Sequence, residues 1–196
     1  MFVFPPKLSA PKSQGLKECM IAIEDNDNDE NNSASTPTKI EENNIHLRYL
    51  SENDVKDVKS LCGDIFPVEY PDFWYNDIAT DPSLWSMAAV SRDKLVGICI
   101  AEVKRLNNCN SEDRDILSKS FPANTPVCYI LSLGVDKAWR RRGIASILLD
   151  QLLAYVKNTS NYGMTGNSAC QIKAVYLHVL VSNMEAISFY ERRKFK

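Results

Sequence analysis

The sequence YILSLGV at residues 129–135, followed after DKAW by RRRGIASILLDQLLAYV at residues 140–156, guides the interpretation of the whole chain. Its first part is rich in β-branched and large apolar residues, which favours a buried strand. In its second part the apolar residues recur at helical spacing, and they are Ile144, Ile147, Leu148, Leu152 and Val156. The stretch therefore predicts a strand, a turn and a helix.

The turn between this strand and this helix has the properties of an anion-binding site. The first N–H groups of a helix have no partners inside it, and the peptide dipoles place partial positive charge there. Gly143 has no side chain to keep a ligand off the backbone, and Arg140, Arg141 and Arg142 add positive charge. A diphosphate could therefore lie against the N–H groups of residues 141–146.

The pattern Arg140-x-x-Gly143-x-Ala145 matches none of the common nucleotide loops. It lacks both the Gly-Lys-Ser/Thr ending of a nucleoside triphosphate loop and the Gly-x-Gly-x-x-Gly of a dinucleotide site. It resembles the acetyl-CoA pyrophosphate loop, Arg/Gln-x-x-Gly-x-Gly/Ala, of the GNAT acyltransferase superfamily. Taken alone, the motif leaves open a basic helix start or a nuclear-targeting patch.

Length and composition fit one catalytic domain preceded by a tail. The chain has 196 residues, 44% of them hydrophobic, which is enough to bury one ordinary core. Residues 1–44 carry four Lys against eight Asp and Glu and show no sustained period, so they are predicted to be a disordered acidic and polar tail. The folded domain is expected over residues 45–196.

Charge and cysteine usage restrict the setting in which the protein works. The net charge of −2 gives no indication of a nucleic-acid partner. No apolar run approaches the length needed to cross a bilayer, so no transmembrane segment is predicted. The six cysteines show no Cys-x-x-Cys pair and the amino terminus shows no signal peptide, which favours a reducing, cytoplasmic setting.

From Ile45 onward the hydrophobic pattern predicts elements in the order β-αα-βββ-α-β-α. The strand, helix and strand that end this order favour parallel pairing of the last two strands through a right-handed crossover. Besides the strand and helix described above, the expected elements are a strand from Ile45, helices from Asp54 and at 72–79, a hairpin of 84–90 with 95–103, a polar helical excursion at 111–120, a strand at 173–180 and a helix from Asn183.

Five separated motifs in one order resemble NatF, the family of Golgi-associated N-terminal acetyltransferases within the GNAT superfamily. They are FPVEYP at 66–71, YILSLGV at 129–135, the loop at 140–145, YLHVL at 176–180, and Asn183 with the FYE of residues 189–191. The resemblance implies an α/β GNAT acyl-CoA N-acyltransferase fold, a mixed sheet flanked by helices. It also implies transfer of acetyl from acetyl-CoA, without a metal, to the α-amine of proteins that start with Met followed by a hydrophobic or basic residue.

The same resemblance implies two catalytic residues. An α-amine has a pKa of about 8, so near neutrality it must lose a proton before it can attack a thioester. The family uses a Tyr and a His for this step, and the matching positions are Tyr129 and His178. Without the resemblance, a lone His on an apolar strand would more often be structural.

The cofactor residues implied by the resemblance come from the central strand, the turn and the last helix. Backbone groups of Leu133, Gly134 and Val135 would pair with pantetheine, and one N–H could polarise the thioester oxygen. Asn183 would bond to a pantetheine amide and cap its helix, while Tyr190 would lie near the sulfur and protonate the leaving thiolate. The diphosphate would lie on the turn formed by Arg141, Arg142, Gly143, Ile144, Ala145 and Ser146.

The substrate residues implied by the resemblance surround the first residues of the peptide. A stiff loop would form the wall of a pocket for the initiator Met, with Leu131 below it. Glu69 would lie beside an amine or a following Lys, which a carboxylate favours. The pocket-wall residues are Phe66, Pro67, Val68 and Tyr70.

The chain ends at Lys196, where GNAT domains continue with one or two closing strands. The expected sheet therefore lacks these strands, and the edge of the strand that carries His178 is expected to be exposed. Full-length family members attach to the cytosolic face of Golgi membranes through a further C-terminal region, so this chain is expected to be cytoplasmic. Two alternatives remain open: a lysine (histone) acetyltransferase, and a non-catalytic acetyl-CoA-binding or interaction fragment.

Overall fold

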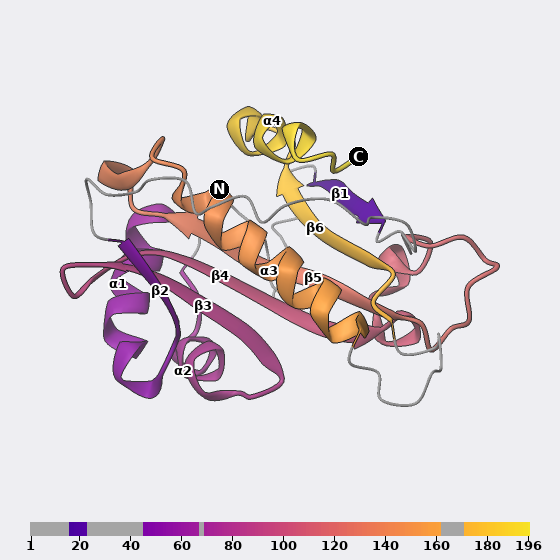
Figure 1. Cartoon of the computed structure of the whole chain (residues 1–196), viewed down its shortest axis with the longest axis horizontal. Helices are drawn as coiled ribbons and strands as arrows, with labels where there is room; N and C mark the ends of the chain where they lie inside the picture. The colour runs from indigo at the N-terminus through magenta and orange to yellow at the C-terminus, as the bar shows by residue number, and fades with distance from the viewer. Residues whose placement is uncertain (1–15, 23–44, 67–68, 162–170) are drawn as a thin grey trace.

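A computed structural model describes residues 16–22, 45–66, 69–161 and 171–196, which form one mixed sheet with helices on both faces (Figure 1). The order predicted from Ile45 onward is confirmed. The strands are β1 (Leu16–Ala22), β2 (Ile45–Tyr49), β3 (Leu84–Ser91), β4 (Lys94–Arg105), β5 (Pro126–Val135) and β6 (Ala174–Leu180). The helices are α1 (Val55–Ile65), α2 (Asp72–Thr80), α3 (Ile144–Asn161) and α4 (Met184–Arg192), with 3-10 turns η1 (Glu52–Asp54), η2 (Leu106–Asn108), η3 (Ser111–Asp113) and η4 (Lys137–Trp139).

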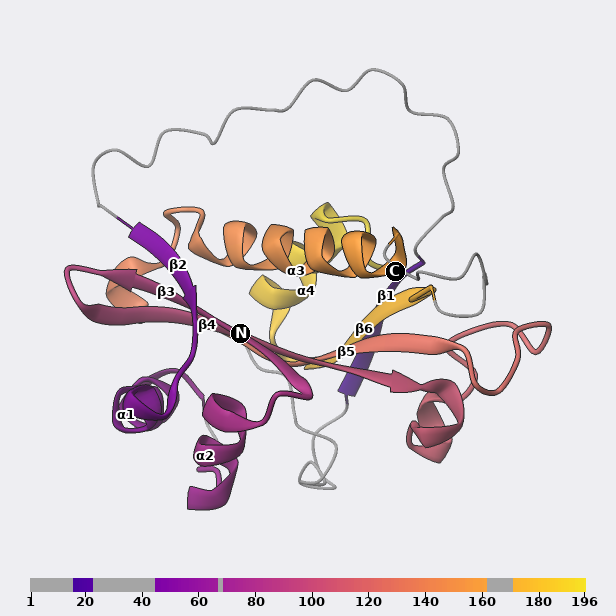
Figure 2. The ribbon, with the colours of Figure 1, turned by 60° about the horizontal axis from the view of Figure 1, so that its bottom comes forward.

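The strands lie in the order β1-β6-β5-β4-β3-β2. All neighbours are antiparallel except β5 and β6, which are parallel and joined through α3, as predicted. Helices α1 and α2 cover one face of the sheet, and α3 and α4 cover the other (Figure 2). Every residue of β5 is buried, because the strand is central and helices lie on both of its faces.

The polar helix predicted over residues 111–120 is wrong beyond the single turn η3. The side chain of Arg114 folds back and donates to the carbonyl oxygens of Cys109, at 3.4 Å, and Asn107, at 3.3 Å. Asp113 is 1% exposed and points into the protein. These contacts organise the segment as an irregular connection between β4 and β5.

The predicted disordered tail is wrong for Leu16–Ala22, which forms β1. This strand pairs antiparallel with β6 from Leu16 opposite Leu180 to Ala22 opposite Ala174, so the expected exposed edge of β6 is covered. On its other side, the backbone of Met20 exchanges hydrogen bonds of 3.0 and 2.8 Å with Lys196. The unpaired backbone groups of β6 explain the ordering, because a short segment with apolar residues can satisfy them as an added strand. The other residues of the predicted tail, 1–15 and 23–44, lie outside the described residues.

Placing a charge within β1 is expected to destabilise the fold. Cys19 is 1% exposed and pairs with Leu177, so Cys19→Asp would bury a carboxylate among apolar groups and lower the free energy of unfolding by about 3 kcal/mol. Urea denaturation measures this change. Ala22→Asp at the exposed end of the same strand is the control and should change it by less than about 0.5 kcal/mol. Equal, small effects at both positions would contradict the pairing of β1 with β6.

Candidate active site

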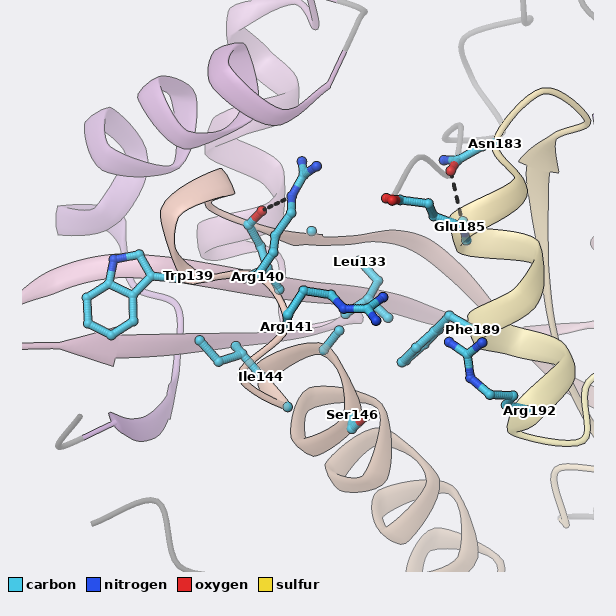
Figure 3. Close-up of a pocket in the computed structure, with 15 residues that line it drawn as sticks. Leu133, Trp139, Arg140, Arg141, Ile144, Ser146, Asn183, Glu185, Phe189 and Arg192 are labelled. Atoms are coloured by element: carbon cyan, nitrogen blue, oxygen red, sulfur yellow. Dashed lines mark hydrogen bonds between the residues drawn. The ribbon is translucent and has the colours of Figure 1, made fainter. Parts of the chain in front are cut away.

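A cleft of about 260 Å³ opens where the end of β5, the turn before α3 and helix α4 meet (Figure 3). Its walls come from the neighbouring segments 133–135 and 139–146 and from the distant segment 183–192. The turn between β5 and α3 joins the first two segments, and the strand–turn–helix arrangement predicted from residues 129–156 is confirmed. Most of the cleft wall therefore comes from residues 129–156, the stretch that predicted a strand, a turn and a helix.

The turn before α3 has a backbone conformation typical of anion-binding sites. Arg141 has a φ of +64° and Gly143 a φ of +81°, so two nearby residues are left-handed. Turns that alternate in this way form concave anion sites, and here the helix N-terminus adds its partial charge. A Cβ atom added at Gly143 would meet no heavy atom within 4 Å, so the space beside this backbone is open. These features fit the diphosphate site expected from the sequence.

The cleft contains most of the predicted cofactor residues and several others. The predicted residues that line it are Leu133, Gly134, Val135, Arg141, Gly143, Ile144, Ala145, Ser146 and Asn183. Arg142 lies outside this lining, with its guanidinium 4.9 Å from the ring centroid of Trp139. The site prediction missed Trp139, Arg140, Glu185, Ala186, Phe189 and Arg192. Helical spacing from Asn183 could have predicted the missed residues of α4. Residues 185, 186, 189 and 192 follow Asn183 along the face of α4 that turns toward α3.

The two α4 residues predicted to contact the cofactor differ in position. The side chain of Asn183 accepts a 3.2 Å hydrogen bond from the N–H of Ala186, which confirms the predicted cap (Figure 3). Its Nδ2 atom is buried and has no hydrogen-bond partner within the described part of the chain. Tyr190 is 0% exposed and does not line the cleft, and burial raises the pKa of its hydroxyl well above the ordinary value. The structure therefore brings Asn183, but not Tyr190, to the cleft.

Strands β5 and β6 separate beside the cleft. Their parallel pairing in the structure covers Cys128 with Val175 and Tyr129 with Tyr176, although both strands continue beyond these pairs. On the other side of β5, Ser132 pairs with Ile100 and Ile130 with Ala101, so Leu131 is the extra residue of a β-bulge. A bulge bends its strand and increases the local twist. The divergence leaves the backbone of Leu133 and Gly134 facing the cleft instead of β6.

Tyr129 and His178 lie together at the point where β5 and β6 separate. The Tyr129 hydroxyl oxygen is 3.3 Å from Nδ1 of His178. The other ring nitrogen, Nε2, is 3.2 Å from Oδ1 of Asp113, whose Oδ2 is 3.4 Å from the Tyr176 hydroxyl. The site prediction missed Asp113, because it comes from an irregular connection whose path a periodic pattern does not reveal. Together the four side chains form a row of close polar contacts from a buried carboxylate to a phenol, in which Asp113 Oδ1 approaches His178 without completing a hydrogen bond.

The environment of Tyr129 keeps its hydroxyl neutral. Burial raises the pKa of Tyr129 far above its ordinary value, and the nearby Asp113 carboxylate raises it further. A phenolate is therefore strongly disfavoured near neutral pH. Tyr129 can take part in a proton transfer by accepting one proton while it passes its own to His178.

Phe66, the first residue of the predicted peptide-binding loop, lies over β5 together with the end of α1. A Cβ atom added at Gly134 would be 2.3 Å from Cδ1 of Ile65, so the helix end packs directly on the strand. Tyr70 stacks on Trp74 with ring centroids 4.0 Å apart and meets Phe66 edge to face. Phe66, Tyr70 and Leu131 are buried and Glu69 is exposed. Pro67 and Val68, also predicted to line the pocket, lie outside the described residues.

Within the ranges that the structure describes, no cluster of three or more His, Cys, Asp or Glu side chains could hold a metal ion. In the same ranges, no helix combines the length and the apolar character required to cross a bilayer.

The mixed sheet and the turn between β5 and α3 agree with the family comparison. The model of the Acetyltransferase (GNAT) family matches residues 55–195. The chain belongs to the GNAT acetyltransferase family, which confirms the fold class and superfamily predicted from the five motifs.

Within the family, the chain is similar to proteins named N-alpha-acetyltransferase 60. It is 47% identical over 152 residues to the one from Danio rerio, an alignment that covers 78% of this chain and 60% of the relative. The one from Drosophila melanogaster is 34% identical over 174 residues, with the same shares of 78% and 60%. The chain thus spans about 60% of the length of these curated relatives. A protein of Arabidopsis thaliana named Histone acetyltransferase MCC1 is 31% identical over 159 residues, again covering 78% of this chain and 60% of the relative.

Solved structures show the same relationship. NAA60 of Arabidopsis thaliana in complex with a bisubstrate analogue is 28% identical and superposes with a TM-score of 0.64 over 78% of this chain and 83% of that one. The same protein in complex with acetyl-CoA is 29% identical, with a TM-score of 0.64 over 78% and 84% of the two chains.

Proposed function

We propose that this protein transfers acetyl from acetyl-CoA to the α-amine of proteins that begin with Met followed by a hydrophobic or basic residue. The observation that carries the proposal is the 3.3 Å approach of the Tyr129 hydroxyl to His178 where β5 and β6 separate, next to an anion-binding turn. An amine acceptor needs a group that removes its proton, and this pair is placed beside the cleft that a thioester cofactor would occupy. The similarity to proteins named N-alpha-acetyltransferase 60 supports the α-amine as acceptor.

The residues present fit acetyl-CoA. The left-handed turn at Arg141 and Gly143 suits the diphosphate, and the free Nδ2 of Asn183 suits a pantetheine carbonyl. The backbone of Leu133 and Gly134 lies along the part of β5 that does not pair with β6. When bound, the cofactor supplies an activated acetyl thioester. Arg142 and Tyr190, which the sequence also assigned to the cofactor, lie outside the cleft lining and are left out of the proposed site.

The proposed proton path follows the row of side chains. A neutral His178 with its proton on Nε2, toward Asp113, leaves the Nδ1 lone pair facing the Tyr129 hydroxyl. The Tyr129 oxygen accepts a proton from the substrate ammonium while its own proton moves to Nδ1. His178 then carries the positive charge, which the Asp113 carboxylate stabilises. Asp113 Oδ1, 3.2 Å from Nε2, would favour this tautomer by accepting a hydrogen bond from it, as carboxylates orient other catalytic histidines.

The peptide is proposed to enter on the face covered by α1 and α2. The side chain of its Met would lie against Phe66, Tyr70 and Leu131, and Glu69 would face the residues that follow.

We also propose that the protein acts on the cytosolic side of Golgi membranes, which the resemblance to NatF supports.

Acetylation of synthetic peptides tests the function. A Met-Leu or Met-Lys peptide with a free α-amine should acquire one acetyl group at that amine, read by tandem mass spectrometry, and the same peptide with a blocked α-amine should acquire none.

A lysine acetyltransferase is the second candidate, supported by the 31% identity to Histone acetyltransferase MCC1. Acetylation of only the blocked Met-Lys peptide, on its side chain, would establish that candidate. Acetyl-CoA binding without any turnover would establish a non-catalytic fragment.

A further inference from the structure

Lys104 is a half-buried lysine next to the proposed proton path. Its side chain is only 8% exposed, although lysine is seldom buried unless it is paired. It lies on β4 two residues after Glu102, which pairs with Tyr129, so Lys104 and Tyr129 share one face of the sheet. Its ammonium is 4.6 Å from the ring centroid of Tyr129 and 5.9 Å from that of Tyr176. The position is a specific one against the two phenol rings.

The carboxylate beside Lys104 accounts for only part of its burial. Glu102 approaches to 3.8 Å, which is longer than a hydrogen bond, and its side chain is 34% exposed. The remaining stabilisation comes from the ring faces, since a cation within about 6 Å of an aromatic centroid is attracted by the ring quadrupole. The contact also holds the Tyr129 ring, whose hydroxyl must meet His178.

The charge of Lys104 opposes that of Asp113 across the same rings. Asp113 is 1% exposed and its Oδ1 is 3.2 Å from Nε2 of His178, and a nearby carboxylate attracts positive charge. In the proposed path, the Nδ1 lone pair of His178 must be free to receive the proton from Tyr129. Among the described residues, the titratable groups around this pair include Lys104 and Glu102 on β4, Tyr176 on β6, Asp113 between β4 and β5, and Tyr70 between α1 and α2. On β1, Glu18 is opposite His178 in the strand register. Lys104 is the cation among these named groups.

We infer that Lys104 is a positioning residue for the Tyr129–His178 pair: its ammonium fixes the Tyr129 ring, and its positive charge beside the pair opposes a second positive charge on His178. The inference about catalysis rests on the proposed function, while the charge effect can be measured without it. Lys104 does not line the cleft.

Proton NMR titration of the full 196-residue chain tests the charge effect directly. The chain has two histidines, and His46, exposed on β2, is an internal control in the same spectrum. Lys104→Met should raise the pH at which the His178 ring titrates by about half a unit or more, because a nearby positive charge is lost. Lys104→Arg keeps the charge and should restore the wild-type midpoint, and Glu102→Gln should lower it. His46 should titrate as in the wild type in every variant.

Activity measurements test the positioning role. In Lys104→Met the acidic limb of the kcat profile should move to higher pH together with the His178 midpoint, and kcat below that limb should fall several-fold while KM for acetyl-CoA stays unchanged. Lys104→Arg should recover the profile, which a loss of packing alone would not predict.

A His178 midpoint that stays in place in Lys104→Met, or that rises in Glu102→Gln, would overturn the inference. If Lys104→Met does not fold, Lys104→Gln keeps a polar end at the buried position and is expected to shift the midpoint in the same direction. Because the titration uses no cofactor or peptide, the expected shifts in an inactive wild-type protein would retain the charge effect and reject the proposed function.

Discussion

His178→Ala is expected to lower kcat for acetylation of a Met-Leu peptide by roughly a hundredfold or more, with the affinity for acetyl-CoA unchanged. The variant removes the proton acceptor at the end of the row, and the substrate amine stays protonated. Tyr129→Phe should have an effect of similar size, because it removes the hydroxyl 3.3 Å from Nδ1 that links the amine to His178. Steady-state kinetics give kcat, and isothermal titration calorimetry gives the cofactor affinity.

His46→Ala is the matched control, since this second histidine is exposed on β2, at the opposite side of the sheet from β6, and should leave kcat at the wild-type value. The double variant Tyr129→Phe/His178→Ala adds a sharper test. Residues that act in one relay are not additive, so the double variant should be about as slow as either single one. Independent, multiplying losses would contradict the relay, and parallel losses of acetyl-CoA affinity would assign both residues a structural role.

Much of the fold could be predicted because the chain's periodicity is local and strong. The apolar run before Val135 and the helical spacing after Gly143 predict β5 and α3, and the parallel pairing of β6 follows from the crossover rule. Strand β1 was missed because Leu16–Ala22 is one short segment in an acidic, proline-containing surrounding. Its order depends on the edge of β6, more than 150 positions along the chain, and a local pattern carries no information about such pairing.

The residues of the candidate site show the same difference between local and long-range signals. Residues that belong to motifs, such as Gly143, Asn183, Tyr129 and His178, could be placed because the motif fixes both identity and position. Asp113 was missed because its contact with His178 depends on the irregular path between β4 and β5.

Two residues that the sequence assigns to the cofactor lie outside the cleft lining, and their positions have a physical reason. Arg142 is adjacent to cleft residues in sequence, but the left-handed turn directs its guanidinium onto Trp139. Tyr190 has the helical spacing of a core residue, and the structure buries it completely.

Gly143→Glu is expected to abolish binding of acetyl-CoA. The backbone at Gly143 borders open space within the cleft, so a side chain there would fill the position where the diphosphate meets the helix N-terminus. Its negative charge would also oppose the phosphates. In the wild type, acetyl-CoA at about a hundred times its Kd should raise the melting temperature by roughly 5 to 10 °C, and the variant should show no rise.

Two control variants separate this effect from others of the same substitution. Gly143→Ala imposes the strain of a φ of +81° on a residue with a side chain, without charge or length. It should melt slightly lower than the wild type yet keep most of the shift with acetyl-CoA. Gly63→Glu adds the same charge at an exposed position of α1 with nothing within 4 Å, and should keep the full shift. A full rise in melting temperature with acetyl-CoA in Gly143→Glu would show that the diphosphate does not lie on this turn. Loss of this rise already in Gly143→Ala would mean that backbone conformation, rather than access to the N–H groups, controls binding.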